Sequence, residues 1–147
     1  MALIQLIYHS RNTLHADDRG QLANLREILE VARRKNGAAG VTGYLIFDKA
    51  CFLQILEGEE QAVEETYARI IGDRRHAEVT VVERRPAKMR VFSSWEMGSA
   101  IRSLDHEEVY LRHGISGPID PAKLDGDKIL ALATDLRDLD AARSRAA

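Results

Sequence analysis

A chain of 147 residues has room for one domain of ordinary size and a short extension, but not for two full domains. Hydrophobic residues make up 45% and charged residues 30%, which is the balance of a globular protein and excludes a wholly disordered chain. The 21 Lys and Arg residues stand against 23 Asp and Glu residues, and the net charge of -2 excludes a general attraction to nucleic acid or to anionic membranes.

The single cysteine and the short apolar runs indicate where the protein resides. Cys51 has no second cysteine to pair with, which excludes an internal disulfide and any metal site built from cysteine pairs, and it fits a reducing compartment. The first residues lack the charged head and long apolar run of a secretory signal, and nowhere do about 18 apolar residues follow one another to span a bilayer. We therefore expect a cytoplasmic protein without a metal centre.

Hydrophobic periodicity predicts the secondary structure of residues 3–98. Short β-favouring runs predict strands, and apolar residues at steps of three and four predict amphipathic helices. In chain order these are a strand at 3–9, a helix at 18–35, strands at 41–47 and 51–57, a helix at 59–71, and strands at 78–84 and 91–98. We expect Asn36 and Gly37 to end the first helix, because both residues tolerate the left-handed backbone that follows many helices.

The predicted order β-α-β-β-α-β, followed by a fifth strand, is that of a split βαβ, ferredoxin-like fold. The expected fold class is therefore α+β, with a mixed sheet that carries both helices on one face. Asp105 and Glu108 open a short helix that ends near Gly114, and a last helix follows. The apolar stripe of that last helix consists of Ile129, Leu132, Leu136 and Leu139. We expect these C-terminal helices to cover the other face of the sheet.

Gln54 does not fit the hydrophobic pattern around it. On the predicted strand 51–57 it shares a face with Phe52 and Leu56, so an amide lies between two large hydrophobic side chains. If the helices cover this face, the amide is buried and needs hydrogen-bond partners. Either a structural glutamine bonded to the backbone or a functional amide explains the pattern.

Tyr8 and Asn36 are two further polar residues with both a structural and a functional interpretation. Tyr8 shares a face with Leu6 on the first strand, which is central in this fold, and a buried phenol needs a partner for its hydroxyl group. By pattern alone, Tyr8 is an ordinary core tyrosine and Asn36 an ordinary helix end.

The sequence contains none of the common catalytic or phosphate-binding motifs. No histidine has another histidine three or four residues away, and no nucleophile elbow, zinc-protease motif, P-loop or dinucleotide-binding glycine motif occurs. Arg74, Arg75 and His76 form a small basic cluster that is either a solvated loop or a contact for an anion.

Several stretches together resemble the BLUF family of flavin-binding blue-light sensors, in the order typical of that family and over about residues 3–100. The matching stretches are residues 6–10 (Leu-Ile-Tyr-His-Ser), 36–45, 52–58 (Phe-Leu-Gln-Ile-Leu-Glu-Gly) and 67–70, with Asp73, Arg75, His76, Phe92 and residues 95–97. The resemblance implies a flavin-binding, light-sensing domain at residues 1–100. It does not cover residues 101–147, which we expect to form a C-terminal helical extension.

The resemblance also implies that the ring of a flavin, usually FAD with FMN as the alternative, lies between the two helices. Tyr8 and Gln54 would be the photochemical pair. The implied flavin contacts are Tyr8 and Gln54, Asn36 at the imide edge, Lys35 near the far carbonyl, Ile28 and Ile70 on the two faces of the ring, and Arg75 and His76 at the ribityl and phosphate end. Trp95 and Met97 correspond to the signalling residues whose side chains exchange places near Gln54.

The residue types agree with this chemistry. A tyrosine is oxidisable, and rotation or tautomerisation of the Gln54 amide changes what faces the flavin without moving a charge. Asn36 offers one donor and one acceptor to the acceptor–donor–acceptor edge of a flavin imide. Two departures from the family are Lys35, where many relatives carry another polar and often amide side chain, and the hairpin at residues 48–51, which lacks the usual glycine.

The leading hypothesis is a stand-alone photoreceptor without its own catalytic domain. The roughly 47 residues after residue 100 are too few for a cyclase or phosphodiesterase domain, so output would pass to a partner such as a cyclic-dinucleotide enzyme, or through a homodimer or larger homo-oligomer. The alternatives are a small ferredoxin-like enzyme of the acylphosphatase type and a regulatory module for another small molecule. The enzyme would need a loop that cradles an anion, and residues 11–15 hold no glycine to form one.

Overall fold

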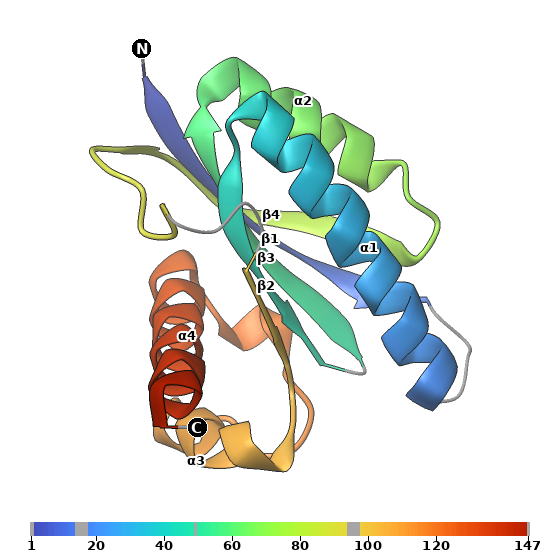
Figure 1. Cartoon of the computed structure of the whole chain (residues 1–147), viewed down its shortest axis with the longest axis vertical. Coiled ribbons are helices and arrows are strands. Elements are labelled where there is room, and N and C mark those ends of the chain that lie inside the picture. The colour runs from blue at the N-terminus through green and yellow to red at the C-terminus, as the bar shows by residue number, and fades with distance from the viewer. Residues whose placement is uncertain (1, 14–17, 49, 94–97, 147) are drawn as a thin grey trace.

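The computed structural model describes residues 2–13, 18–48, 50–93 and 98–146, which form one sheet with helices on both sides (Figure 1). The strands are β1 (Leu3–Asn12), β2 (Thr42–Phe47), β3 (Cys51–Glu59), β4 (His76–Ala87) and β5 (Gly98–Ile101). The helices are α1 (Asp18–Ala39), α2 (Glu60–Ile71), α3 (Glu107–Arg112) and α4 (Gly126–Ala146), with 3₁₀ turns at Leu104–His106 and Pro121–Lys123.

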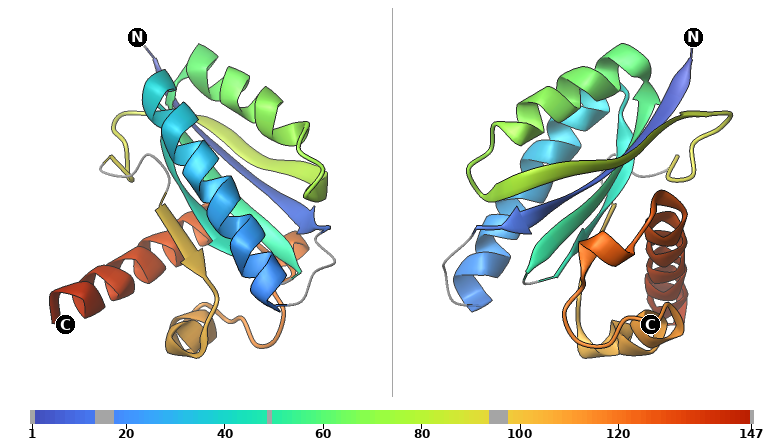
Figure 2. Two further views of the ribbon diagram at one scale, coloured as in Figure 1. Left: turned by 45° about the vertical axis from the view of Figure 1, so that its right-hand side comes forward. Right: turned by 180° about the vertical axis from the view of Figure 1, so that it is seen from behind.

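The five strands lie in the order β4-β1-β3-β2-β5. β1 is antiparallel to both β3 and β4, and β2 is antiparallel to β3, whereas β5 runs parallel to β2. α1 and α2 cover one face of this mixed sheet, and α3 and α4 lie on the other side (Figure 2). The α+β, ferredoxin-like prediction with a fifth strand and C-terminal helices on the second face is confirmed.

Side-chain alternation along the strands divides the apolar residues into two cores. Under α1 and α2, Leu6 and Leu56 pack with residues of both helices, Leu25 and Val63 among them. Gln54 shares this helix-covered face with Leu56, and its amide is buried there. Its immediate neighbours along β3 face the other core, which is built together with α3 and α4.

The C-terminal segment closes the second core. Ile129, Leu132 and Leu136 are each fully buried, and Leu139 packs against the same cluster. α3 and α4 are also joined by a contact of 2.6 Å between His113 Nε2 and Asp135 Oδ2. Within the ranges that the structure describes, no helix has both the length and the apolar character needed to cross a membrane.

The predicted end of the first helix is wrong. α1 continues through Asn36 and Gly37 to Ala39, and Gly40 adopts the left-handed backbone with φ of +72°. Val41 N–H donates to the carbonyl oxygen of Asn36 at 2.9 Å, and Gly40 N–H to that of Gly37 at 3.3 Å, which is a Schellman ending. Gly40 therefore stops the helix, and Asn36 is one turn inside it.

The strand predicted at 91–98 is also misplaced, because residues 91–93 are not in a strand and β5 is Gly98–Ile101. Val91 and Phe92 lie in a bend, and their N–H groups donate to the carboxylate of Glu57, both at 2.8 Å. Those two amides are thus bonded to a side chain rather than to a neighbouring strand. Trp95 and Met97, the predicted signalling residues, lie outside the described residues.

The glycine-free hairpin between β2 and β3 closes through Asp48. Its backbone N–H and carbonyl oxygen pair with those of Cys51, and its side chain accepts a hydrogen bond from Ala50 N–H at 2.7 Å. An aspartate side chain that bonds to the backbone two residues later is a common substitute for glycine in a turn.

Replacing Leu132 with alanine should lower the free energy of unfolding by about 2–5 kcal/mol, because it leaves a cavity in the core beneath α4. The matched control is Leu111→Ala on α3, where a side chain that is 61% exposed should change stability by no more than about 0.5 kcal/mol. Urea unfolding of both variants measures the difference. Equal losses would contradict the packing of α4 on the sheet.

Candidate functional site

A cavity of about 230 Å³ lies between α1 and α2, above the sheet. Its surface is mostly apolar, and its polar side chains come from β3, from α1 and α2, and from the turn that leads into β4. The lining residues are Ile28, Leu29, Val31, Ala32, Lys35, Leu45, Phe52, Gln54, Arg69, Ile70, Asp73, Arg75 and His76. Apolar walls with a few converging polar groups are typical of a site for a small flat ligand.

Gln54 reaches this cavity from β3 and is directly opposite Tyr8 in the register of β1 with β3. The Tyr8 hydroxyl donates a hydrogen bond to Gln54 Oε1. Both side chains are buried, and the amide noticed in the sequence has a side-chain partner. The bond directs the acceptor end of the amide toward Tyr8, which leaves its N–H groups as the donor end.

Burial also fixes the protonation state of Tyr8. Removal from water raises the pKa of the phenol well above its usual value near 10, with a smaller contribution in the same direction from Tyr67. The Tyr67 ring lies edge-on to that of Tyr8, with 5.2 Å between the ring centroids. Tyr8 therefore stays protonated and acts as the donor toward Gln54.

Ile28 of α1 and Ile70 of α2 line the cavity from the two helices, and both are partly buried. Lys35 lines the same cavity from the C-terminal part of α1, where its side chain is exposed. The family resemblance implied that these three residues surround a flavin ring, and the fold brings them to one cavity.

Asn36 is fully buried behind this cavity and is not one of the residues that line it. Its Oδ1 atom accepts a hydrogen bond of 3.0 Å from Nη2 of Arg69, which does line the cavity. Arg69 therefore connects the asparagine to the cavity wall. Sequence reasoning assigned no role to Arg69, although it directly precedes Ile70 in a stretch that matched the family.

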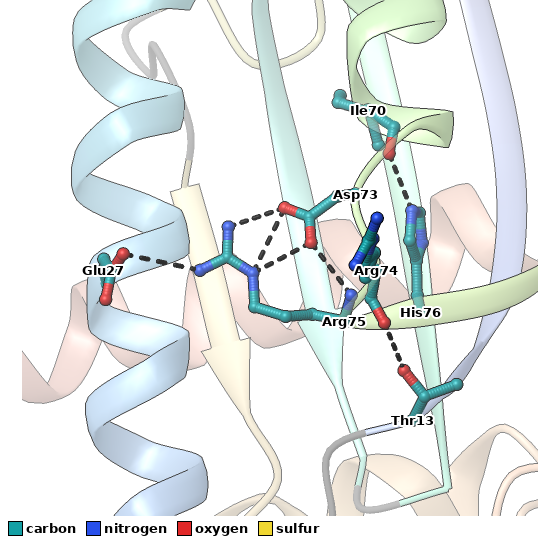
Figure 3. A network of polar contacts seen from close by, with 7 residues as sticks. All are labelled: Thr13, Glu27, Ile70, Asp73, Arg74, Arg75 and His76. Carbon is teal, nitrogen blue, oxygen red and sulfur yellow. Dashed lines mark hydrogen bonds and ion pairs between the residues drawn. The ribbon is translucent and has the colours of Figure 1, made fainter.

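Arg75 lies at the cavity between two carboxylates (Figure 3). Its Nε and Nη2 atoms donate to Oδ1 and Oδ2 of Asp73 at 2.9 and 2.6 Å, and its Nη1 lies 3.8 Å from Glu27 Oε1 on α1. These hydrogen bonds lower the pKa of Asp73 and raise that of Arg75, so both groups remain charged. Asp73 is a second cavity residue for which no role was predicted.

Both ring nitrogens of His76 contact protein groups. Nε2 lies 2.8 Å from the carbonyl oxygen of Ile70 (Figure 3), and Nδ1 lies 2.7 Å from the hydroxyl oxygen of Ser10 on β1. Since a carbonyl only accepts, Nε2 of the neutral ring carries the proton and Nδ1 accepts from Ser10. His76 thus ties the end of α2, where Ile70 lies, to β1.

The residues of this cavity fit a flavin ring. Ile28 and Ile70 supply apolar surface from both helices, the Gln54 amide supplies a neutral polar group inside, and Lys35 and Arg75 supply cations at the edge. The volume is below the roughly 300–1,000 Å³ of drug-sized pockets, which suits a flat heterocycle rather than a whole dinucleotide.

Comparisons with known proteins agree with this fit. A model of the BLUF family, described as sensors of blue-light using FAD, matches residues 3–98. Photoactivated adenylate cyclase subunit beta of Euglena gracilis is 38% identical over 82 residues, or 55% of this chain and 10% of that protein. The blue light- and temperature-regulated antirepressor BluF of Escherichia coli K12 is 38% identical over 74 residues, or 50% of this chain and 17% of that protein.

Solved structures of similar size extend the likeness beyond the matched region. The photo-activated state of BlsA superposes with a TM-score of 0.79 and 28% identity, over 91% of this chain and 94% of that one. The dark state of the BLUF protein BlrB gives a TM-score of 0.71 and 29% identity, over 92% and 98% of the two chains.

The chain spans only about a tenth of the length of the first curated relatives that it matches. The family model nevertheless covers well over half of this chain, and every lining residue of the cavity lies inside the matched range. The chain belongs to the BLUF family, the flavin-binding sensors of blue light.

Proposed function

We propose that this chain is a blue-light photoreceptor whose signal starts at the hydrogen bond between Tyr8 and Gln54 and passes to a separate protein. The observation that carries the proposal is that bond. It joins an oxidisable phenol to a neutral amide, both groups are buried, and the amide lines the cavity that fits a flavin ring.

The bound flavin supplies absorption of blue light and an acceptor for an electron. Tyr8 is an oxidisable side chain, and its hydroxyl proton already points at Gln54 Oε1. Gln54 would take up this proton at Oε1 and release one from its nitrogen toward the cavity, so that the amide stays neutral. Rotation or tautomerisation of the amide then replaces a donor with an acceptor toward the cavity. An amide does this without a net charge, whereas a carboxylate here would place an unpaired charge in an apolar site.

Asn36 and Lys35 are the residues that we assign to the polar edge of the ring. Because Gly40 ends α1, helix capping does not account for the asparagine, and its complete burial beside a cavity-lining arginine is consistent with an amide that holds a ligand. Lys35 adds a positive charge one residue earlier, at the exposed rim of the cavity.

Ile28 and Ile70 are assigned to the two faces of the ring, and Arg75 to the ribityl and phosphate end. For His76 we favour a supporting role at that end, because both of its nitrogens are already bonded to Ile70 and Ser10. The imidazole would then hold one wall of the site in place.

The output is assigned to residues 101–147, with residues 1–100 as the sensing domain. Members of the family are joined to different outputs, as the names of the adenylate cyclase and the antirepressor state, and BlrP1 of Klebsiella pneumoniae was solved with cyclic diGMP. We propose a separate effector for this chain, for which a cyclic-dinucleotide enzyme is one candidate class, and a homodimer as the signalling unit.

The purified protein should be yellow with the spectrum of oxidised flavin, and blue light should shift that spectrum slightly to the red and reversibly. The reason is that a changed hydrogen bond from Gln54 alters the flavin environment without lasting reduction. Absorption spectra before illumination, after it and during dark recovery check this. A protein that stays colourless with added FAD and FMN, or that keeps a reduced flavin after illumination, would contradict the proposal.

Tyr8→Phe and Gln54→Leu should each retain the fold and the flavin but lose the red-shifted state. Phenylalanine lacks the oxidisable hydroxyl, and leucine keeps the bulk of glutamine without its amide. Tyr67→Phe is the matched control, since this neighbouring ring contacts Tyr8 while the hydroxyl bonded to Gln54 belongs to Tyr8. Light-minus-dark absorption spectra measure the red-shifted state of each variant. Near-normal photocycling of Tyr8→Phe or Gln54→Leu would contradict the proposed role of that residue.

Asn36→Ala should weaken flavin affinity about tenfold or more, because it removes hydrogen bonds at the polar edge of the ring. Asn24→Ala serves as the control, as this asparagine lies on the same helix but bonds the backbone of Gly20. Titration of the apoprotein with FAD measures both affinities. Unchanged affinity of Asn36→Ala would show that this amide has only a structural role.

A further inference from the structure

A buried carboxylate lies on the face of the sheet opposite the cavity. Glu57 is 1% exposed, and its two oxygens accept three hydrogen bonds, from Gln5 Nε2 at 3.0 Å and from Val91 N–H and Phe92 N–H at 2.8 Å each. A charged carboxylate that receives several N–H groups is stable away from water. The bend at residues 91–92 is therefore held by one side chain of β3.

Polar contacts lead from Glu57 across the sheet to the start of α4. Gln5 on β1 donates to Glu57, and its Oε1 atom accepts from Nε of Arg85 on β4 at 2.9 Å. Arg85 Nη1 in turn donates to Asp127 in the first turn of α4 at 2.8 Å. Since Gln5 donates at one end and accepts at the other, its amide cannot turn over without breaking both contacts.

A second contact ties α4 to the same bend. Arg137 Nη1 donates to the carbonyl oxygen of Val91 at 2.9 Å, and its guanidinium lies 5.4 Å from the centroid of the Phe92 ring. Val91 is thus held by Glu57 through its N–H and by α4 through its carbonyl. The two attachment points on α4, Asp127 and Arg137, are about 15 Å apart along the helix.

We propose that Glu57 is a positioning residue that couples the light-sensing side of the sheet to the docking of α4. Glu57 lies three residues after Gln54 on the same strand but faces the other core, and the bend that it holds precedes β5 in the chain. A change at Gln54 that displaces β3 or this bend alters both links to α4, the one from Arg85 to Asp127 and the one from Arg137 to Val91. The inference rests on the proposed light-sensing function.

Glu57→Gln is the sharpest test, because it keeps the shape of the side chain and replaces one acceptor oxygen with a donor that faces an N–H group. Arg137→Met is a second variant, which breaks the link to Val91 from the helix side. Asp135→Asn is the matched control: it weakens the separate contact of α4 with His113 of α3 and leaves the contacts of Glu57 intact.

The measurement is hydrogen exchange of the flavin-loaded, full chain in the dark and under blue light, together with the absorption spectrum. We expect light to change exchange in residues 126–146 of the wild type. In Glu57→Gln and in Arg137→Met the red shift should persist, while the light-minus-dark difference over α4 falls about fivefold or more. Asp135→Asn should keep that difference.

Two results would overturn the coupling. One is a wild type that shifts to the red with no change of exchange in α4. The other is a full light-minus-dark difference over α4 in Glu57→Gln or, should that variant not fold, in Arg137→Met, which would leave the carboxylate with a structural role only. A wild type without any red shift instead refutes the proposed function on which the inference depends, so the two failures are distinct.

Discussion

Antiparallel pairing joins β1 to β3 in unbroken register from Leu3 opposite Glu59 to Arg11 opposite Cys51. Because successive side chains point to opposite faces, this register places Tyr8 opposite Gln54 under the helices and Gln5 opposite Glu57 on the other face. A slip by one residue would move both polar pairs into the wrong core. The pairing of β1 with β4 shows shifts on either side of Tyr8, so irregularity is taken up by the neighbouring edge strand.

The cavity combines two electrostatic environments. Inside, the polar groups are neutral, and burial keeps Tyr8 protonated. At the edge, Arg75 pairs with Asp73 and Glu27, where the side chain of Arg75 is still 28% exposed and that of Glu27 69% exposed. Ion pairs that solvent reaches contribute only about 0–1 kcal/mol, so this edge can rearrange around a charged group with little loss of stability.

Local patterns predicted most of the fold and singled out Gln54, whereas the expected roles of Tyr8 and Asn36 came from the family resemblance. The period of two along β3 identified Gln54 as an amide in an apolar face. The change between a period of two residues and one of three to four residues predicted the order of strands and helices. The end of α1 was predicted wrongly at Asn36 and Gly37, because Gly40 can also end a helix and lies only three residues later. Which of these residues ends the helix depends on how α1 packs. The Asn36–Arg69 bond joins residues 33 positions apart, and periodicity carries no information about such pairs. From the sequence, Glu57 is only the last residue of the predicted strand 51–57. Its partners Val91 and Phe92 follow after α2 and β4, and periodicity does not connect residues so far apart.

Tyr8 and Gln54 have a further property that follows from the burial of the phenol. With the pKa of Tyr8 well above its usual value and no ionisable group on Gln54, neither member of the pair gains or loses a proton to solvent near neutral pH. Two arrangements of the amide that bind the same number of protons have an equilibrium that does not depend on pH. The equilibrium between the two arrangements of the pair therefore stays constant when the surrounding pH changes, whereas that of a sensor built on histidine would shift.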